Sequence, residues 1–163
     1  AVLNDLQKAW GRTFQGWTVG ATCDRAQGLE GVSCDDSGMI TDIDLRGSSL
    51  VGSIPDSISL LTRLSVLTLF DNNLNGSFPA GLRNMISLQD IDLSTNQLTG
   101  SVPAFIQNLS LLSSLSLARN SFPGSIPDSL SSLAQLNSLE LQDNNLSGSI
   151  PLGLGKMTSL SSL

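Results

Sequence analysis

Aliphatic residues recur along this chain at a constant spacing. The stretches LSVLTLFDNNLNGSFP and LQDIDLSTNQLTGSVP begin at Leu64 and Leu88, 24 residues apart, and keep their apolar letters while most others differ. The same step links aliphatic residues along the chain: Ile40, Leu64, Leu88, Leu112, Leu136 and Leu160. No insertion or deletion interrupts the series, so the pattern predicts an array of stacked units.

Each unit combines a short strand pattern with turn residues. Its fourth and sixth residues are aliphatic and alternate with others, which predicts a strand with one buried face. Gly and Pro close the phrase, and the segments after Pro, such as DSISLLTR at 56–63, are expected to form short helical turns on the opposite side. One unit cannot bury its apolar face alone, so the units must stack; each buried Leu would then contribute roughly 1.5–3 kcal/mol.

Asparagine recurs at the ninth position of the unit. It is present in four units: Asn72, Asn96, Asn120 and Asn144. Its side-chain amide can satisfy backbone groups that the turn after the strand would leave unpaired. We therefore expect an asparagine ladder inside the turns. Ser48 replaces Asn in the first unit, so the ladder should be weaker at that end.

Residues 1–39 do not follow the repeat. Five apolar residues share one side of a predicted helix here: Val2, Leu3, Leu6, Ala9 and Trp10. The only two cysteines, Cys23 and Cys34, also lie in this segment. From their spacing, a disulfide of a secreted protein and a pair of unrelated buried thiols are both possible.

The repeat resembles the plant-type leucine-rich repeat, LxxLxLxxNxLxGxIPxxLxxLxx. Five full units run from Ile40 to Ser159, and a sixth starts at Leu160. The resemblance implies an α/β repeat fold, a right-handed leucine-rich repeat solenoid with a concave parallel β-sheet over residues 40–163. GVSC at 31–34 is similar to the N-terminal cap of plant leucine-rich repeat ectodomains. That similarity implies a helical cap over residues 1–39, a Cys23–Cys34 disulfide and an oxidising compartment.

Charge and composition narrow the function. The net charge of −6 makes the phosphate backbone of nucleic acids a poor partner. No stretch approaches the ~20 apolar residues of a membrane span, so no membrane contact is expected from this segment. The chain has no His, and no Ser has a plausible base beside it in the repeat, which argues against an enzyme. GLGKMT at 153–158 lacks the leading Gly of a phosphate-binding loop. We expect no cofactor and no metal, while a kinase domain could lie downstream.

The third, fifth, seventh and eighth residues of each unit should point away from the core onto the concave face. At the fifth position, acids alternate with small hydroxyls: Asp44, Thr68, Asp92, Ser116 and Glu140. Strands lie roughly 4.8 Å apart, so these carboxylates would be about 10 Å from one another. That separation is too large for one metal ion but suits an extended basic ligand, such as a peptide. The alternative is that the acids only keep an exposed sheet soluble.

Phe70 is the only aromatic residue expected on this face, and with Asp71 beside it, it resembles the aromatic anchors of protein interfaces. The alternative is a Phe packed against the strand edge. The candidate binding residues are Asp42, Asp44, Phe70, Asp71, Asp90, Asp92, Ser94, Ser116, Arg119, Glu140, Gln142 and Asp143. Three sequons make Asn75, Asn108 and Asn145 possible glycosylation sites.

The resemblance implies extracellular recognition, as in the ectodomains of plant receptor-like kinases and receptor-like proteins. The expected partners are a peptide or protein ligand and a co-receptor leucine-rich repeat ectodomain, at the outer face of the plasma membrane or in the apoplast or cell wall. Two alternatives stay open: a secreted inhibitor similar to polygalacturonase-inhibiting proteins, and a structural cell-wall protein. Because Leu160 and Leu163 would otherwise face water beside an open strand edge, we also expect further sequence after them.

Overall fold

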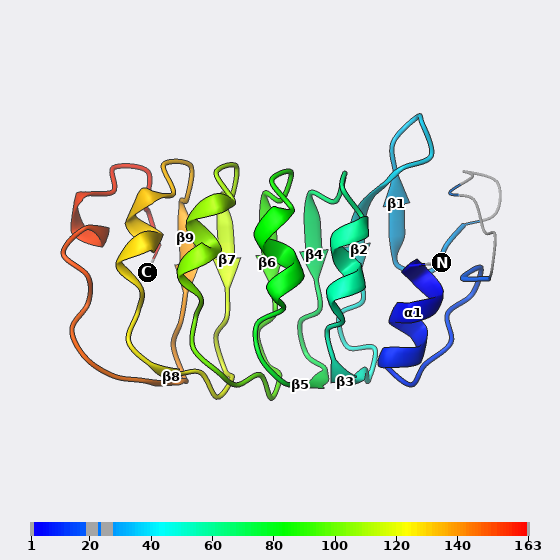
Figure 1. Ribbon diagram of the computed structural model, residues 1–163, viewed down its shortest axis with the longest axis horizontal. Helices are drawn as coiled ribbons and strands as arrows, with labels where there is room; N and C mark the ends of the chain where they lie inside the picture. Colours follow the sequence, from blue (N-terminus) through cyan, green and yellow to red (C-terminus); the bar gives the residue numbers. More distant parts are fainter. Residues whose placement is uncertain (1, 19–22, 24–27, 163) are drawn as a thin grey trace.

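The computed structural model describes residues 2–18, 23 and 28–162 of the chain. The repeats stand side by side along the long axis, with the N-terminal helix at one end and the last repeat at the other (Figure 1). Leu163, which the sequence predicts to be exposed to water, lies outside the described residues. Among the described residues, no helix combines the length and the apolar character that crossing a membrane requires.

The main sheet takes one strand from each of the five full repeats and one from the N-terminal cap. It has six strands: β1 (Val32–Cys34), β2 (Ile40–Asp44), β4 (Val66–Thr68), β6 (Asp90–Asp92), β7 (Ser114–Ser116) and β9 (Ser138–Glu140). Pairing is parallel throughout, except that β1 runs antiparallel to β2 at the N-terminal edge. The register aligns the fourth residue of every repeat, so Ile43, Leu67 and Ile91 stack as fully buried neighbours. The predicted strand and its buried face are confirmed.

Short parallel strand pairs form a second layer along one side of the solenoid, at the lower edge of Figure 1. Their strands are β3 (Val51–Ser53), β5 (Asn73–Asn75), β8 (Pro123–Gly124) and β10 (Asn145–Leu146). β3 pairs with β5 and β8 with β10, and a single bridge joins Ser77 to Thr99. The sequence pattern did not predict these strands, because NxLxG reads as a turn.

Short 3-10 helices follow Pro in four repeats, and a fifth lies in the last full repeat, on the side away from the main sheet (Figure 1). They are η1 (Asp56–Leu60), η2 (Ala80–Asn84), η3 (Ala104–Asn108), η4 (Asp128–Ser132) and η5 (Leu154–Lys156). In η1 to η4, Pro precedes the helix in an extended conformation, because its ring fixes φ and it has no N–H to pair. The predicted helical turns are confirmed.

The asparagine ladder forms as predicted. Nδ2 of Asn120 donates to the carbonyls of Leu93, Leu117 and Ala118 at 2.9, 3.2 and 3.2 Å. Oδ1 of Asn120 accepts the N–H of Leu98 at 2.9 Å. Each Asn therefore ties its own turn to the preceding repeat.

The first repeat has a weaker version of this ladder, also as predicted. The Ser48 hydroxyl donates only a long 3.4 Å bond to the Arg46 carbonyl. The guanidinium of Arg12, from the cap, donates to the Ser48 carbonyl. Arg12 therefore satisfies a turn carbonyl here from outside the repeat.

The N-terminal cap closes the core at its first repeat. Helix α1 (Val2–Ala9) and the residue after it bury Leu6 and Trp10 completely, and Val2, Leu3 and Ala9 pack on the core at its margin. The buried Gln7 carboxamide donates to the Trp17 carbonyl and accepts the Phe14 N–H, both at 2.7 Å.

Cys23 and Cys34 form a disulfide, with their Cα atoms 6.1 Å apart. The separation lies within the usual range for disulfides. The bond connects β1 to the preceding segment of the cap, and the implied pairing is confirmed.

Candidate functional site

The concave face of the main sheet gathers most of the net charge of the chain. We define it by twenty residues: Asp42, Asp44, Arg46, Gly47, Val66, Thr68, Phe70, Asp71, Asp90, Asp92, Ser94, Thr95, Ser114, Ser116, Ala118, Arg119, Ser138, Glu140, Gln142 and Asp143. Seven carboxylates and two guanidiniums give it a net charge of −5, against −6 for the whole chain. The rest of the surface is therefore close to neutral.

The strands end on this face in a repeated left-handed turn. The eighth residue of every repeat has φ between +53° and +59°: Gly47, Asp71, Thr95, Arg119 and Asp143. Gly and Asp tolerate this conformation, whereas a β-branched Thr is strained in it. The same backbone geometry places the side chains of the four residues other than Gly47 in corresponding positions at the edge of the face.

Both arginines of the concave face are held by carboxylates of the same face. Arg46 lies over Asp44, with Nε at 2.9 and 3.1 Å from its two carboxylate oxygens and Nη2 at 2.7 Å. These bonds lower the pKa of Asp44. Nε of Arg119 lies 3.4 Å from Asp143. Asp44 thus differs from the free acid that the fifth-position pattern suggested.

The remaining acids are spread over the face, from Asp42 on β2 to Glu140 on β9. They are Asp42, Asp71, Asp90, Asp92 and Glu140, and within the described part of the chain none of them forms an ion pair. Phe70, with 37% of its surface exposed, lies directly before Asp71. Phe70 therefore offers an apolar ring beside the unpaired carboxylate of Asp71, with Asp90 and Asp92 on the neighbouring strand β6.

Two predicted binding residues are less accessible than the sequence pattern suggested. Ser94 and Ser116 expose only 7% and 8% of their surface. The Ser94 hydroxyl donates to Asp92 at 2.5 Å, and the Ser116 hydroxyl donates to Glu140 at 2.8 Å. Both serines hold a neighbouring carboxylate in place, so the acids are the groups that face a ligand.

Asp90 is the acid on this face with a raised pKa. Partial burial disfavours its charged form, a hydrogen bond with Ser114 opposes this effect, and the nearby charge of Asp92 adds to it. A folded-state pKa above the unfolded value means that the charge of Asp90 costs stability once the pH rises through the folded pKa.

The substitution Asp90→Asn is expected to raise the free energy of unfolding at pH 7 by about 0.5 kcal/mol, a size usual for partly exposed sites. At pH 3 the gain should vanish, since Asp90 is then protonated in both states. Urea unfolding at the two pH values measures this. Asp92→Asn is the control, because Asp92 accepts the Ser94 N–H at 3.0 Å and its loss should not stabilise. A destabilised Asp90→Asn at pH 7 would contradict the prediction.

A second exposed surface, the lateral flank, has the opposite character. It comprises the tenth, twelfth and fourteenth residues of the five repeats: Ser49, Val51, Ser53, Asn73, Asn75, Ser77, Gln97, Thr99, Ser101, Ser121, Pro123, Ser125, Asn145, Ser147 and Ser149. All fifteen are exposed and none is charged. Sequence reasoning missed this surface, although its signal, the absence of charge at three positions in every repeat, is visible in the sequence.

The three sequon asparagines are all exposed. Asn75 and Asn145 lie on the lateral flank, in β5 and β10, and Asn108 ends η3 on the side away from the main sheet. A glycan on Asn75 or Asn145 would therefore stand on the flank.

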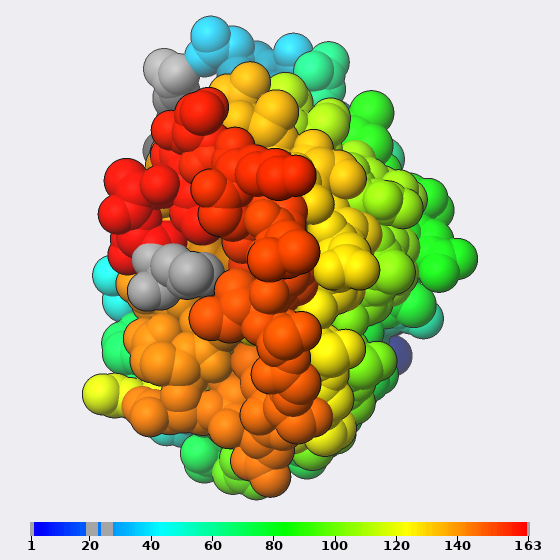
Figure 2. Space-filling view, turned by 90° about the vertical axis from the view of Figure 1, so that its left-hand side faces the viewer, coloured from blue at the N-terminus to red at the C-terminus, as the bar shows by residue number. Residues whose placement is uncertain are grey.

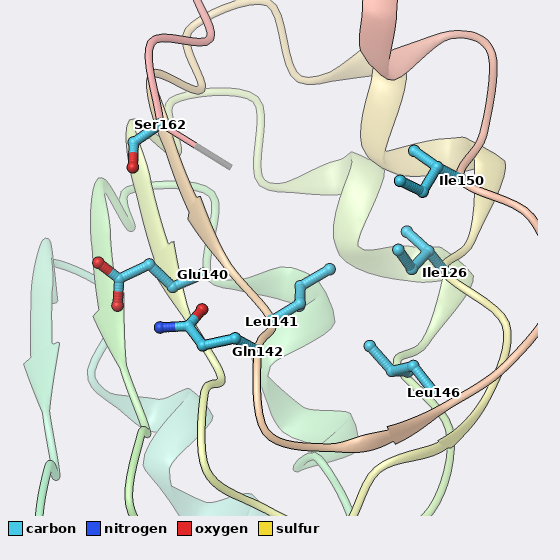
Figure 3. Close-up of a pocket in the computed structure, with 7 residues that line it drawn as sticks. All are labelled: Ile126, Glu140, Leu141, Gln142, Leu146, Ile150 and Ser162. Atoms are coloured by element: carbon cyan, nitrogen blue, oxygen red, sulfur yellow. The ribbon is translucent and has the colours of Figure 1, made fainter.

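A hollow of about 450 Å³ lies at the end of the solenoid beyond β9. Figure 2 views the molecule from this end, which the orange and red residues of the last repeat cover. In Figure 3, Leu141, Ile126, Leu146 and Ile150 lie around the hollow, while Glu140 points to the other side of the strand. Its apolar lining comes from these four residues, and Glu140, Gln142 and Ser162 also border it. Among the described residues, no group of three or more His, Cys, Asp or Glu side chains could hold a metal ion.

Comparisons with known proteins agree with this geometry. Sequence models of the leucine-rich repeat match residues 63–85 and 86–146, and they describe a structural repeat rather than a catalytic domain. By sequence, no curated protein matches the chain.

Three solved structures are similar. A chain of the BIR3–SERK2 complex of Arabidopsis thaliana is 32% identical, with a TM-score of 0.84, over 99% of this chain and 90% of that one. The leucine-rich repeat ectodomain of the receptor kinase SOBIR1, also from Arabidopsis thaliana, is 27% identical, with a TM-score of 0.84, over 99% and 87%. A plant ice-binding protein is 30% identical, with a TM-score of 0.87, over 96% of this chain and 51% of that one. The chain therefore belongs to the leucine-rich repeat family, in the plant-type form of receptor ectodomains.

Proposed function

We propose that the concave face binds an extended basic peptide or protein segment outside the cell, and that the chain serves as the perceiving part of a plant receptor. The observation that carries this proposal is the placement of charge. The face holds a net charge of −5, and its two arginines are already paired with Asp44 and Asp143. Of the carboxylates that remain, Asp71 directly follows Phe70 in the chain, and Asp90 and Asp92 lie on β6, the strand that pairs with β4.

The geometry favours an extended ligand over a compact one. The acids come from successive strands roughly 4.8 Å apart, so a peptide crossing the strands would meet a new carboxylate at nearly every step. A Lys or Arg side chain beside Asp71 could lay its cation on the face of the Phe70 ring, a contact worth about 0.5–1 kcal/mol at an exposed site. Charge complementarity of this kind sets partner choice and association rate more than affinity.

Several features support an extracellular setting. The Cys23–Cys34 disulfide persists in oxidising compartments. The sequons at Asn75, Asn108 and Asn145 are exposed, so glycans could be attached without unfolding. The similar BIR3–SERK2 structure is a complex of two proteins, which supports a second ectodomain as a further partner. The plasma membrane or the cell wall is the proposed location, and transmission of a signal is the proposed consequence.

Binding of a labelled peptide with alternating Lys and Ser tests the proposal, measured by fluorescence anisotropy at low salt against the same peptide with Glu in place of Lys. We expect the Lys peptide to bind and to weaken as salt is added. Phe70→Ala should reduce its affinity about tenfold, as an interface anchor would. Asp71→Asn, which suits the left-handed turn, should reduce it severalfold.

Two exposed residues on the opposite side provide matched controls. Ile86→Ala removes an exposed apolar side chain and Asp128→Asn removes an exposed carboxylate, and neither should change binding. Equal affinity for the Lys and Glu peptides, or unchanged binding by Phe70→Ala, would count against the concave face.

A second candidate function is binding to ice. The observation that favours it is the lateral flank, which is exposed and free of charge in all five repeats. The similar plant ice-binding protein, which matches 96% of this chain, supports it as well. Partition of the wild-type chain into slowly growing ice, against a soluble protein of the same size, tests this function. If the wild-type chain is excluded from the ice to the same extent as the reference protein, ice binding is ruled out as a function.

A further inference from the structure

The lateral flank and the concave face differ in how they hold water. On the concave face, nine of the twenty residues are ionisable, and each charged group binds its hydration water tightly. On the flank, thirteen of the fifteen residues carry hydroxyl or amide groups, and the other two are Val51 and Pro123. Hydroxyls and amides donate and accept hydrogen bonds as water does. The flank can therefore take the place of water molecules in an ordered lattice, whereas the concave face cannot.

The flank is held in a regular geometry. The glycine at the thirteenth position has φ between +73° and +83° in all five repeats, so the backbone follows the same path each time. The residue two positions before two of these glycines, Leu74 and Leu98, is fully buried and anchors its segment to the core. Pairing is direct between Ser53 and Asn75, and between Ser77 and Thr99. Neighbouring strands repeat at roughly 4.8 Å, close to the spacing of oxygen atoms along one axis of hexagonal ice.

The flank lacks what other extended ligands would need. It has no charge for a nucleic acid or a charged polymer. It has no aromatic ring for a sugar to stack on, since every Phe and Trp of the chain lies at other positions. Ice needs neither.

We infer that the lateral flank is the surface that contacts ice, with Thr99 and Ser101 of the middle repeat at its centre. The inference rests on ice binding as the second candidate function and assigns it to this face of the molecule. Glycans on Asn75 or Asn145 would stand on the same surface and cover it. The chain is therefore to be tested without N-glycans, after oxidative refolding from a bacterial host.

The test places one charge on the flank and the same charge elsewhere. Thr99→Lys introduces a cation at the centre of the flank, and Thr62→Lys introduces it at an exposed site outside both surfaces. Inhibition of ice recrystallisation and partition into growing ice are measured for both variants and the wild type. Circular dichroism melting confirms that each variant is folded.

We expect Thr99→Lys to need at least a fivefold higher concentration than the wild type for the same inhibition, and Thr62→Lys to match the wild type. If the wild type binds ice and both variants match it, or both lose activity equally, the assignment to the flank is overturned while ice binding stands. If the wild type does not enter ice, ice binding itself fails, and the assignment fails with it.

Discussion

Gly52→Ala is expected to lower the free energy of unfolding by about 3 kcal/mol, through two costs that add at one site. The residue has φ +83°, which a side chain disfavours by roughly 1–2 kcal/mol. A Cβ here would also lie 2.5 Å from the carbonyl oxygen of Ala9, at the end of α1. That oxygen is backbone, so the clash can be relieved only by moving the helix off the first repeat.

Gly124→Ala is the matched control. Gly124 holds the same place in the fourth repeat with the same φ of +83°, but a Cβ added there would have no other atom within 4 Å. The free energy of unfolding of Gly124→Ala should therefore fall only by the backbone cost of roughly 1–2 kcal/mol. The difference between the two variants therefore measures how tightly the cap is seated on the repeats.

Both tryptophans of the chain, Trp10 and Trp17, lie in the cap, so tryptophan fluorescence reports on the cap, while far-ultraviolet circular dichroism reports on the whole chain. In urea, the fluorescence transition of Gly52→Ala should move to lower urea than that of Gly124→Ala. If the fluorescence transitions of the two variants shift equally, the Ala9 carbonyl does not restrict the space at Gly52.

The repeat core could be predicted from the sequence because one physical requirement governs it. A strand buried on one face must place apolar residues at fixed places, and stacking makes those places recur without slippage. Ile43, Leu67 and Ile91 therefore align as the spacing predicted. The asparagine ladder was predictable for the same reason, because a buried turn must pair its backbone groups.

Other features depend on side-chain geometry that the repeat leaves free. The bond between Arg46 and Asp44, which are two residues apart, decides which acids are neutralised. The spacing of the repeat does not predict this bond. The burial of Ser94 and Ser116 follows from which carboxylate each hydroxyl meets. The second layer of strands follows from pairing between neighbouring repeats, which a single repeat does not encode.

The candidate sites differ in the same way. The acids of the concave face were identified from the sequence, since outward positions of a strand are known once its buried face is known. The flank was not, because its residues lie in a segment read as a turn. Only after β3 and β5 are seen to pair do Ser53 and Asn75 become neighbours on one surface. Once these residues are known to share one surface, their lack of charge becomes a property of the whole lateral flank.

Asn120→Ala is expected to lower the free energy of unfolding by about 3 kcal/mol, because one side chain serves four backbone groups. Truncation removes the bonds to the Leu93, Leu117 and Ala118 carbonyls and to the Leu98 N–H. Each such bond contributes about 0.5–1.5 kcal/mol, and buried groups left without partners cost more. Asn73→Ala, at an exposed site, is the control and should change stability by no more than about 0.5 kcal/mol.

Asn120→Asp separates hydrogen bonding from lost volume. The carboxylate keeps the shape of the amide and can accept the Leu98 N–H, but it has no N–H to donate and faces three carbonyl oxygens. In urea unfolding at pH 7 it should therefore be less stable than Asn120→Ala, and it should recover part of the loss at low pH, where a protonated acid can donate one bond. An Asp variant as stable as the wild type at pH 7 would mean that the three carbonyls do not need the amide and that apolar stacking alone holds the repeats in register.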